Sequence, residues 1–221
     1  MTDAQDDDHR VVQLVTRAAG VGASVGADAA ARLLDYLDAM LARNRAHNLT
    51  AIRDPAAAEV LHALDSLAVG ALRLSRPTRA LDLGSGNGFP GVALAVLWPQ
   101  LPVTLLERTA KKARALGDLA ATVGLEHVDI AHVDAAQVPA LRPDLDSAYD
   151  LITARAVAEP GAVARLAQPM LAPGGTLLLW LEADARPQPQ LRGGLRRERH
   201  HRYALPEPAP RRRQLVSYIA R

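Results

Sequence analysis

A glycine-rich turn limits the folds open to this chain more than any other segment. Residues 80–91 read ALDLGSGNGFPG, a short apolar segment followed by glycines at alternating positions and a proline. Glycines let the backbone turn tightly and approach a ligand closely, and proline suits the first turn of a following helix. Such a strand–turn–helix unit is typical of the carboxyl edge of a parallel sheet, where nucleotide-like ligands bind.

The chain after this turn alternates between strand and helix patterns. We expect five strands, at residues 79–83, 103–107, 128–133, 150–153 and 175–181. Helical patterns lie between them, at about 90–98, 109–123 and 160–171. Two further alternating segments, 200–205 and 214–220, predict an antiparallel hairpin at the sheet edge. Together these patterns predict a Rossmann-like α/β fold with a mostly parallel seven-stranded sheet.

The first 75 residues have helical patterns only. An apolar stripe recurs at helical spacing through Leu33, Leu37 and Met40. A second helix is expected to begin at Asp54-Pro55 and to run to about Leu74, because proline is tolerated in the first turn. We therefore divide the chain into a helical cap at 1–75 and a sheet domain at 76–221.

Composition excludes several classes of protein. The chain has no cysteine, which removes thiolate zinc sites and any cysteine nucleophile. The apolar run at 177–181, like every other in the chain, is far shorter than the roughly 20 residues that span a bilayer. The N-terminus is acidic and polar, the opposite of a signal peptide. We expect a cytoplasmic monomer with no membrane contact.

Positive charge gathers at two places. Residues 186–221 hold ten arginines against Glu198 and Glu207, although the net charge of the whole chain is only +2. Lys111, Lys112 and Arg114 begin a predicted helix, where cations oppose the helix dipole. Both groups are suited to contacting phosphates, and a solvated arginine-rich surface is the alternative interpretation.

Two cofactors compete for the glycine-rich turn. Gly86, Gly88 and Gly91 satisfy the G-x-G-x-x-G pattern of NAD-binding proteins. Asp82 with Gly84, Gly86 and Gly88 instead matches the acidic glycine loop of class I S-adenosylmethionine-dependent methyltransferases. An aspartate is unfavourable beside a pyrophosphate but suits the cationic sulfonium and amino group of S-adenosylmethionine. The acid therefore favours S-adenosylmethionine, with NAD and an unliganded turn as alternatives.

Two further strand ends supply candidate contacts for the cofactor. Glu107 ends the second strand, nineteen residues after Gly88, and its carboxylate is placed to accept from both ribose hydroxyls. Asp134 follows the third strand and is predicted to accept from the adenine amino group. The backbone N–H groups of Ala135 and Ala136 would then meet the ring nitrogens. The alternative is that Asp134 serves only as a turn residue or helix cap.

The acceptor atom is approached by elimination. The exit of the fourth strand, 153–157, lacks the (Asp/Asn)-Pro-Pro-aromatic motif of exocyclic amine methyltransferases. Methylation of pyrimidine carbon 5 in RNA needs a cysteine nucleophile, which the chain lacks. An oxygen acceptor usually needs a base or a metal, and the sequence has no cluster of histidines and carboxylates at ligand spacing. A purine ring nitrogen such as guanine N7 remains, because its lone pair needs no deprotonation and positioning is sufficient.

The joint motifs resemble a known family. Residues 84–91, GSGNGFPG, look like the glycine loop of the RsmG (GidB) family of bacterial 16S rRNA guanine-N7 methyltransferases. The likeness extends to NLTAIRDP at 48–55, HALDSL at 62–67, AKK at 110–112 and ARA at 154–156. It implies that the partner is 16S rRNA or the small ribosomal subunit. It also implies that the cofactor and reaction site are lined by Gly84, Phe89, Ala135, Ala136 and Arg155.

Three residues are candidates for a catalytic role, and each has a structural alternative. Arg155 is expected at the site, with a structural salt bridge as the alternative. His62 is expected to catalyse or to form a buried structural pair with Asp65. Asn48 is expected to reach the cleft or to fix its own turn. The chain departs from the family where Leu181-Glu182 replaces a Lys-Gly. A small-molecule methyltransferase and a non-catalytic cofactor-binding protein are therefore retained as alternatives.

Overall fold

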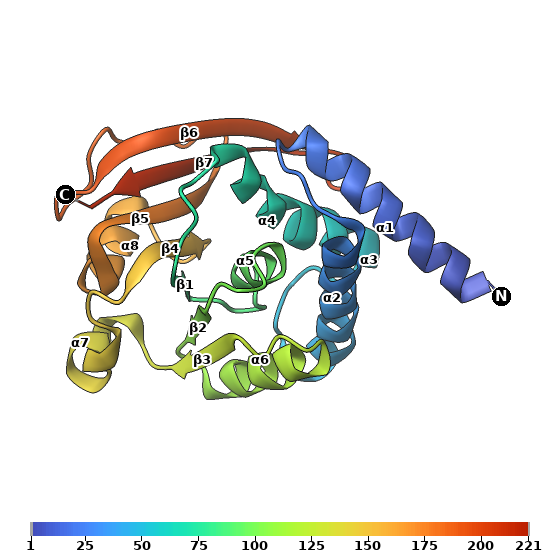
Figure 1. Cartoon of the computed structure of the whole chain (residues 1–221), viewed down its shortest axis with the longest axis horizontal. Coiled ribbons are helices and arrows are strands. Elements are labelled where there is room, and N and C mark those ends of the chain that lie inside the picture. Colours follow the sequence, from blue (N-terminus) through green and yellow to red (C-terminus); the bar gives the residue numbers. More distant parts are fainter. Residues whose placement is uncertain (1, 221) are drawn as a thin grey trace.

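The computed structural model describes residues 2–220, with side chains from residue 7 onward, and contains one seven-stranded sheet (Figure 1). The strands are β1 Ala80–Leu83, β2 Val103–Glu107, β3 Val128–His132, β4 Tyr149–Arg155, β5 Leu171–Glu182, β6 Arg196–Leu205 and β7 Arg211–Ile219. The α-helices are α1 Thr2–Gly20, α2 Ala27–His47, α3 Pro55–Ala58, α4 Asp65–Leu67, α5 Gly91–Leu97, α6 Ala110–Thr122, α7 Val138–Leu141 and α8 Pro160–Ala167. Short 3-10 helices cover Ala68–Leu72, Ala135–Gln137, Pro143–Leu145 and Gln168–Met170.

The strand order is β3-β2-β1-β4-β5-β7-β6. Strands β1 to β5 pair in parallel, and β7 pairs antiparallel with both β5 and β6. Every residue of β1 and β2 is buried, as expected for parallel strands covered on both faces. The edge strand β6 is mostly exposed and rich in arginine, which discourages pairing with another chain. The Rossmann-like fold predicted from the sequence is confirmed.

Helices cover both faces of the sheet (Figure 1). One hydrophobic cluster joins the N-terminal helices to α5, α6 and the sheet, and includes Leu33, Leu105 and Leu116. A second cluster, with Ile152 and Val163, fills the space between the other face and α7 and α8. The helical cap thus shares its core with one face of the sheet. No helix within residues 2–220 has the length and apolar character needed to cross a membrane.

The segment expected as one helix from Asp54 to about Leu74 differs from the prediction. It begins as predicted, because the Asp54 carboxylate accepts from the Ala57 N–H at 2.7 Å and caps α3. It then widens into a π-helix at Glu59–Leu64, narrows through α4 and ends in a 3-10 helix at Leu72. Arg73 adopts a left-handed conformation, which stops the helix before Leu74.

Candidate functional site

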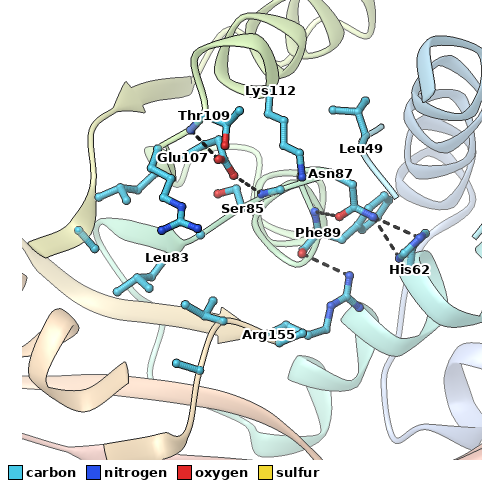
Figure 2. A pocket seen from close by; sticks show the side chains of 18 of the residues that line it. Leu49, His62, Leu83, Ser85, Asn87, Phe89, Glu107, Thr109, Lys112 and Arg155 are labelled. Atoms are coloured by element: carbon cyan, nitrogen blue, oxygen red, sulfur yellow. Dashed lines mark hydrogen bonds between the residues drawn. The ribbon is translucent and has the colours of Figure 1, made fainter. Parts of the chain in front are cut away.

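A cavity of about 710 Å³ opens at the carboxyl ends of β1, β2 and β4 (Figure 2). The glycine-rich turn forms its floor, and residues 49–62 of the helical cap form one wall. The predicted site residues among those that line it are Gly84, Gly86, Phe89, His62, Glu107, Asp134, Ala135 and Arg155. Asn48, Asp82, Gly88 and Ala136 do not line it. The structure thus brings together eight of the twelve predicted residues.

The glycines of the turn serve different purposes. Gly86 has φ +56°, and a Cβ built there would have no atom closer than the Gly84 carbonyl at 3.8 Å, so this position faces the open cavity. A Cβ at Gly88 would lie 2.1 Å from the Tyr36 hydroxyl. The space that the missing Cβ leaves is taken by this hydroxyl, which donates to the Asn87 carbonyl. Gly86 therefore leaves room for a ligand, whereas Gly88 leaves room for a side chain of α2.

Glu107 lies at the end of β2 with its carboxylate buried at the cavity wall. One carboxylate oxygen accepts from the Gly86 N–H at 3.0 Å and the other from the Thr109 N–H at 2.7 Å (Figure 2). The side chain therefore fixes the glycine-rich turn against the start of α6. Lys112, in the first turn of that helix, points toward the glycine-rich turn, while Lys111 lies outside the cavity lining.

Asp82 lies beneath the turn instead of beside the cavity, because its neighbours in the sheet hold it there. Its carboxylate accepts from the Thr153 hydroxyl at 2.8 Å, and its other oxygen has no hydrogen-bond partner among the described residues. Burial raises the pKa of Asp82 to about 6, against the hydrogen bond from Thr153, which lowers it. Asp82 is thus buried outside the cavity lining, and its contact with a sulfonium group stays a prediction.

The exit of β3 is a small capped turn. The Asp134 carboxylate accepts from the Ala136 N–H at 2.9 Å and caps the 3-10 helix Ala135–Gln137. This bond occupies the N–H of Ala136 that was predicted to meet a ring nitrogen. Asp134 and Ala135 themselves remain in the cavity lining.

His62 lies on the π-helix and is held by the two segments that it faces. Its Nε2 lies 2.9 Å from the Thr50 hydroxyl, and the Asn87 side-chain amide lies 3.2 Å from the ring. Desolvation by burial, helped by the positive charge of Arg155, lowers the pKa of His62 to about 3. The Phe89 ring stacks on it with centroids 5.8 Å apart. His62 is therefore neutral near pH 7 and ties the cap to the glycine-rich turn.

His62 and Asp65 are both buried, but they do not form the expected pair with each other. The Asp65 carboxylate accepts from Arg155 Nη1 at 3.1 Å, Arg213 Nη2 at 3.2 Å and the Tyr203 hydroxyl at 2.5 Å. Arg155 donates in addition to the Phe89 carbonyl at 3.2 Å. The predicted Arg155 thus lines the cavity while a buried ion pair fixes its guanidinium.

Asn48 has a local role in the structure. It follows α2 in a left-handed conformation with φ 50°, and its N–H donates to the Asn44 carbonyl. The turn that it begins is clamped by Asn44, which exchanges two hydrogen bonds of 2.9 Å with Thr50. Thr50 in turn contacts His62. Asn48 therefore shapes the wall of the cavity without reaching it.

Sequence reasoning missed several residues at the site. Asn87 occupies the variable position of the glycine motif, yet its side chain connects His62 to the Phe89 N–H. Leu49 and Ile52 supply apolar lining, and Arg211 and Arg213 of β7 reach the same cavity. The surplus of arginines near the end of the chain could have indicated Arg211 and Arg213. Arg221, which belongs to the same surplus, lies outside the described residues. Within the described part of the chain, no cluster of His, Asp or Glu could hold a metal ion.

The sheet, its C-terminal hairpin and the glycine-lined cavity define the fold of class I methyltransferases. A SAM dependent methyltransferase from Aquifex aeolicus superposes with a TM-score of 0.55 and 16% identity, covering 76% of this chain and 94% of that one. TrmN from Thermus thermophilus gives a TM-score of 0.55 and 21% identity, covering 80% of this chain and 53% of that one. These likenesses concern the fold.

Sequence similarity identifies the family. The family described as GidB, rRNA small subunit methyltransferase G, matches residues 29–187. The ribosomal RNA small subunit methyltransferase G of Sorangium cellulosum is 42% identical over 165 residues, which cover 74% of this chain and 68% of that protein. Its namesake from Leptothrix cholodnii is 40% identical, covering 73% of each chain. The chain belongs to the GidB family of methyltransferases.

Proposed function

We propose that this protein transfers a methyl group from S-adenosylmethionine to N7 of a guanine in 16S rRNA. The observation that carries the proposal is the cavity at the carboxyl ends of β1, β2 and β4, floored by a glycine-rich turn in a chain of the GidB family. The names of the relatives, which specify ribosomal RNA of the small subunit, support the substrate.

The residues of the cavity fit S-adenosylmethionine. Gly86 has a positive φ and open space beside it, as required where a backbone must approach a ligand. Glu107, Asp134 and the backbone at Ala135 would hold the adenosine, and Gly84 and Phe89 would border the methionine end. When bound, S-adenosylmethionine supplies a methyl group on a cationic sulfonium, ready for attack by a lone pair.

The residues of this chain supply orientation instead of proton transfer. Guanine N7 is a hydrogen-bond acceptor with a free lone pair, so its methylation releases no proton that a side chain must remove. His62 is neutral near pH 7 and held by Thr50 and Asn87, which makes it a positioning residue for the turn. Arg155 is fixed by Asp65 at the edge of the cavity, where its charge and donors orient the substrates. Catalysis then rests on positioning and exclusion of water.

The direct test is transfer of a labelled methyl group from S-adenosylmethionine to small ribosomal subunits isolated from cells that lack this protein. After nuclease digestion, mass spectrometry is expected to find the label in 7-methylguanosine of 16S rRNA alone. Label in another nucleoside would contradict N7 as the acceptor. Binding of S-adenosylmethionine without any transfer to RNA would support a small-molecule enzyme or a non-catalytic protein.

A further inference from the structure

A second cavity of about 750 Å³ adjoins the first one on the side of β5 and β7. The two cavities share Arg155, Ala156, Ala158, Arg211 and Arg213 in their linings, so they meet at the exit of β4 and the start of β7. The first cavity is assigned to the cofactor under the proposed function. A group in the second cavity could therefore present an atom to the methyl donor only across this shared wall.

Two of the three arginines in the shared wall, Arg155 and Arg213, are paired with a buried carboxylate. Asp65, which is fully buried, accepts from both Arg155 and Arg213, and their side chains are only 9% and 11% exposed. Arg213 also forms an ion pair with Glu182, its partner in the register of β5 and β7. The carboxylate of Glu182 is thus engaged by the protein itself.

Other charged groups of the second cavity are not engaged. Glu159 immediately precedes α8 and its side chain does not cap the helix. No ion pair or side-chain hydrogen bond to Glu159, Arg186 or Arg211 is formed within the part of the chain that the structure describes. The cavity therefore offers one free carboxylate and two free guanidinium groups.

A carboxylate is a selective reader of guanine. Its two oxygens accept two parallel hydrogen bonds, and guanine presents two adjacent donors, N1–H and the N2 amino group, on its Watson–Crick edge. None of the other three bases presents two adjacent donors on that edge. Enzymes that act on a base take it out of the stack and read this edge in a pocket. Guanine N7 lies on the opposite edge of the base and stays free.

We infer that the second cavity receives the acceptor guanine and that Glu159 reads its Watson–Crick edge. This inference rests on the proposed function. Glu159 lines the second cavity and not the first, so a guanine bound to it could direct N7 toward the shared wall. Arg186 and Arg211 lie where the flanking phosphates of an RNA strand would be met by guanidinium groups. Glu159 is a specificity-determining residue for the same reaction.

The test compares small subunits that carry guanosine or inosine at the methylated position, because inosine lacks only the N2 amino group. The wild-type protein is expected to show a kcat/KM about 10- to 150-fold higher on guanosine, because inosine makes one hydrogen bond fewer to the charged carboxylate. Glu159→Gln is expected to lower kcat/KM on guanosine and to lose the preference. Its amide group donates where guanine also donates, and inosine removes that conflict. Glu126→Gln, an exposed residue outside both cavities, is the matched control and should keep the wild-type ratio.

A wild-type ratio near one, or an unchanged ratio in Glu159→Gln, would overturn the inference while leaving the proposed function intact. If the wild-type protein transfers no methyl group to RNA, the proposed function fails instead. Binding of GMP and IMP, followed by ligand-observed NMR, then decides the assignment of the cavity. Tighter binding of GMP than of IMP that is lost in Glu159→Gln would support it, and equal binding would refute it.

Discussion

Replacing Asp65 with Asn should destabilise the fold far more than any exchange of a surface acid. Asp65 is 0% exposed, and its carboxylate accepts from two arginines and one tyrosine. The three partners come from β4, β7 and β6, so this single group connects the helical cap to three strands. Asn keeps the shape of the side chain but removes the charge that both arginines pair with. Its N–H₂ group must also replace either the oxygen that accepts from Tyr203 or the one that accepts from the two arginines.

The expected magnitude follows from the burial of the partners. Removing one partner of a buried ion pair typically costs about 3–5 kcal/mol, because the remaining charge has no counter-ion. In a chain of this size each kcal/mol lowers the melting temperature by about 2–4 °C, so Asp65→Asn should lower it by about 6–20 °C. Asp118→Asn is the matched control. Its carboxylate pairs with Arg43 at the surface, where such pairs contribute about 0–1 kcal/mol.

Both variants are measured by urea denaturation, followed by circular dichroism, at one pH and one salt concentration. The free energy of unfolding and the slope against urea are compared with those of the wild-type protein. A loss of less than about 1 kcal/mol for Asp65→Asn, within the range of exposed pairs, would refute the account of this network. A loss of about 3–5 kcal/mol in the free energy of unfolding would show that the shared wall of the two cavities depends on Asp65.

Three other predictions concern acid, the glycine-rich turn and salt. The pKa of His62 in the fold, about 3, lies below its ordinary value of 6.5, so its contribution to stability is present above pH 6.5 and lost toward pH 3. His62→Gln should therefore reduce the loss of unfolding free energy over that range, as denaturation at several pH values would show. Gly86→Val should abolish binding of S-adenosylmethionine in calorimetry, whereas Gly88→Ala should lower the melting temperature, because its Cβ would lie 2.1 Å from the Tyr36 hydroxyl. Affinity for RNA should fall by roughly 0.7–0.9 log units per log unit of salt for each phosphate contacted, and a flat response would favour a small-molecule substrate.

The parts of the fold that depend on local pattern could be predicted from the sequence. The alternation of apolar strands and helices, together with the glycine-rich turn, predicted the parallel sheet and its C-terminal hairpin, and both are confirmed. The position of Glu107 at the cavity follows from its place at the end of a buried strand. These features depend on backbone geometry that a few neighbouring residues determine.

The features that depend on distant pairing could not be predicted. Asp65 accepts hydrogen bonds from Tyr203 and Arg213, which lie 138 and 148 residues further along the chain. No local sequence pattern predicts such distant partners. Gly88 looked like a ligand contact, yet its lack of a side chain accommodates Tyr36 of α2. The π-helix around His62 was missed because its sequence has the same apolar spacing as an ordinary helix.

Exchanging one atom of the substrate tests whether guanine N7 receives the methyl group. Small subunits are assembled with 7-deazaguanosine at the nucleotide that the protein methylates, so that a C–H group replaces N7 while O6, N1 and the N2 amino group stay unchanged. With unmodified guanosine at that position as the control, we predict complete loss of methyl transfer to the 7-deaza substrate. Continued methylation of that nucleotide would contradict the claim that the N7 lone pair receives the methyl group.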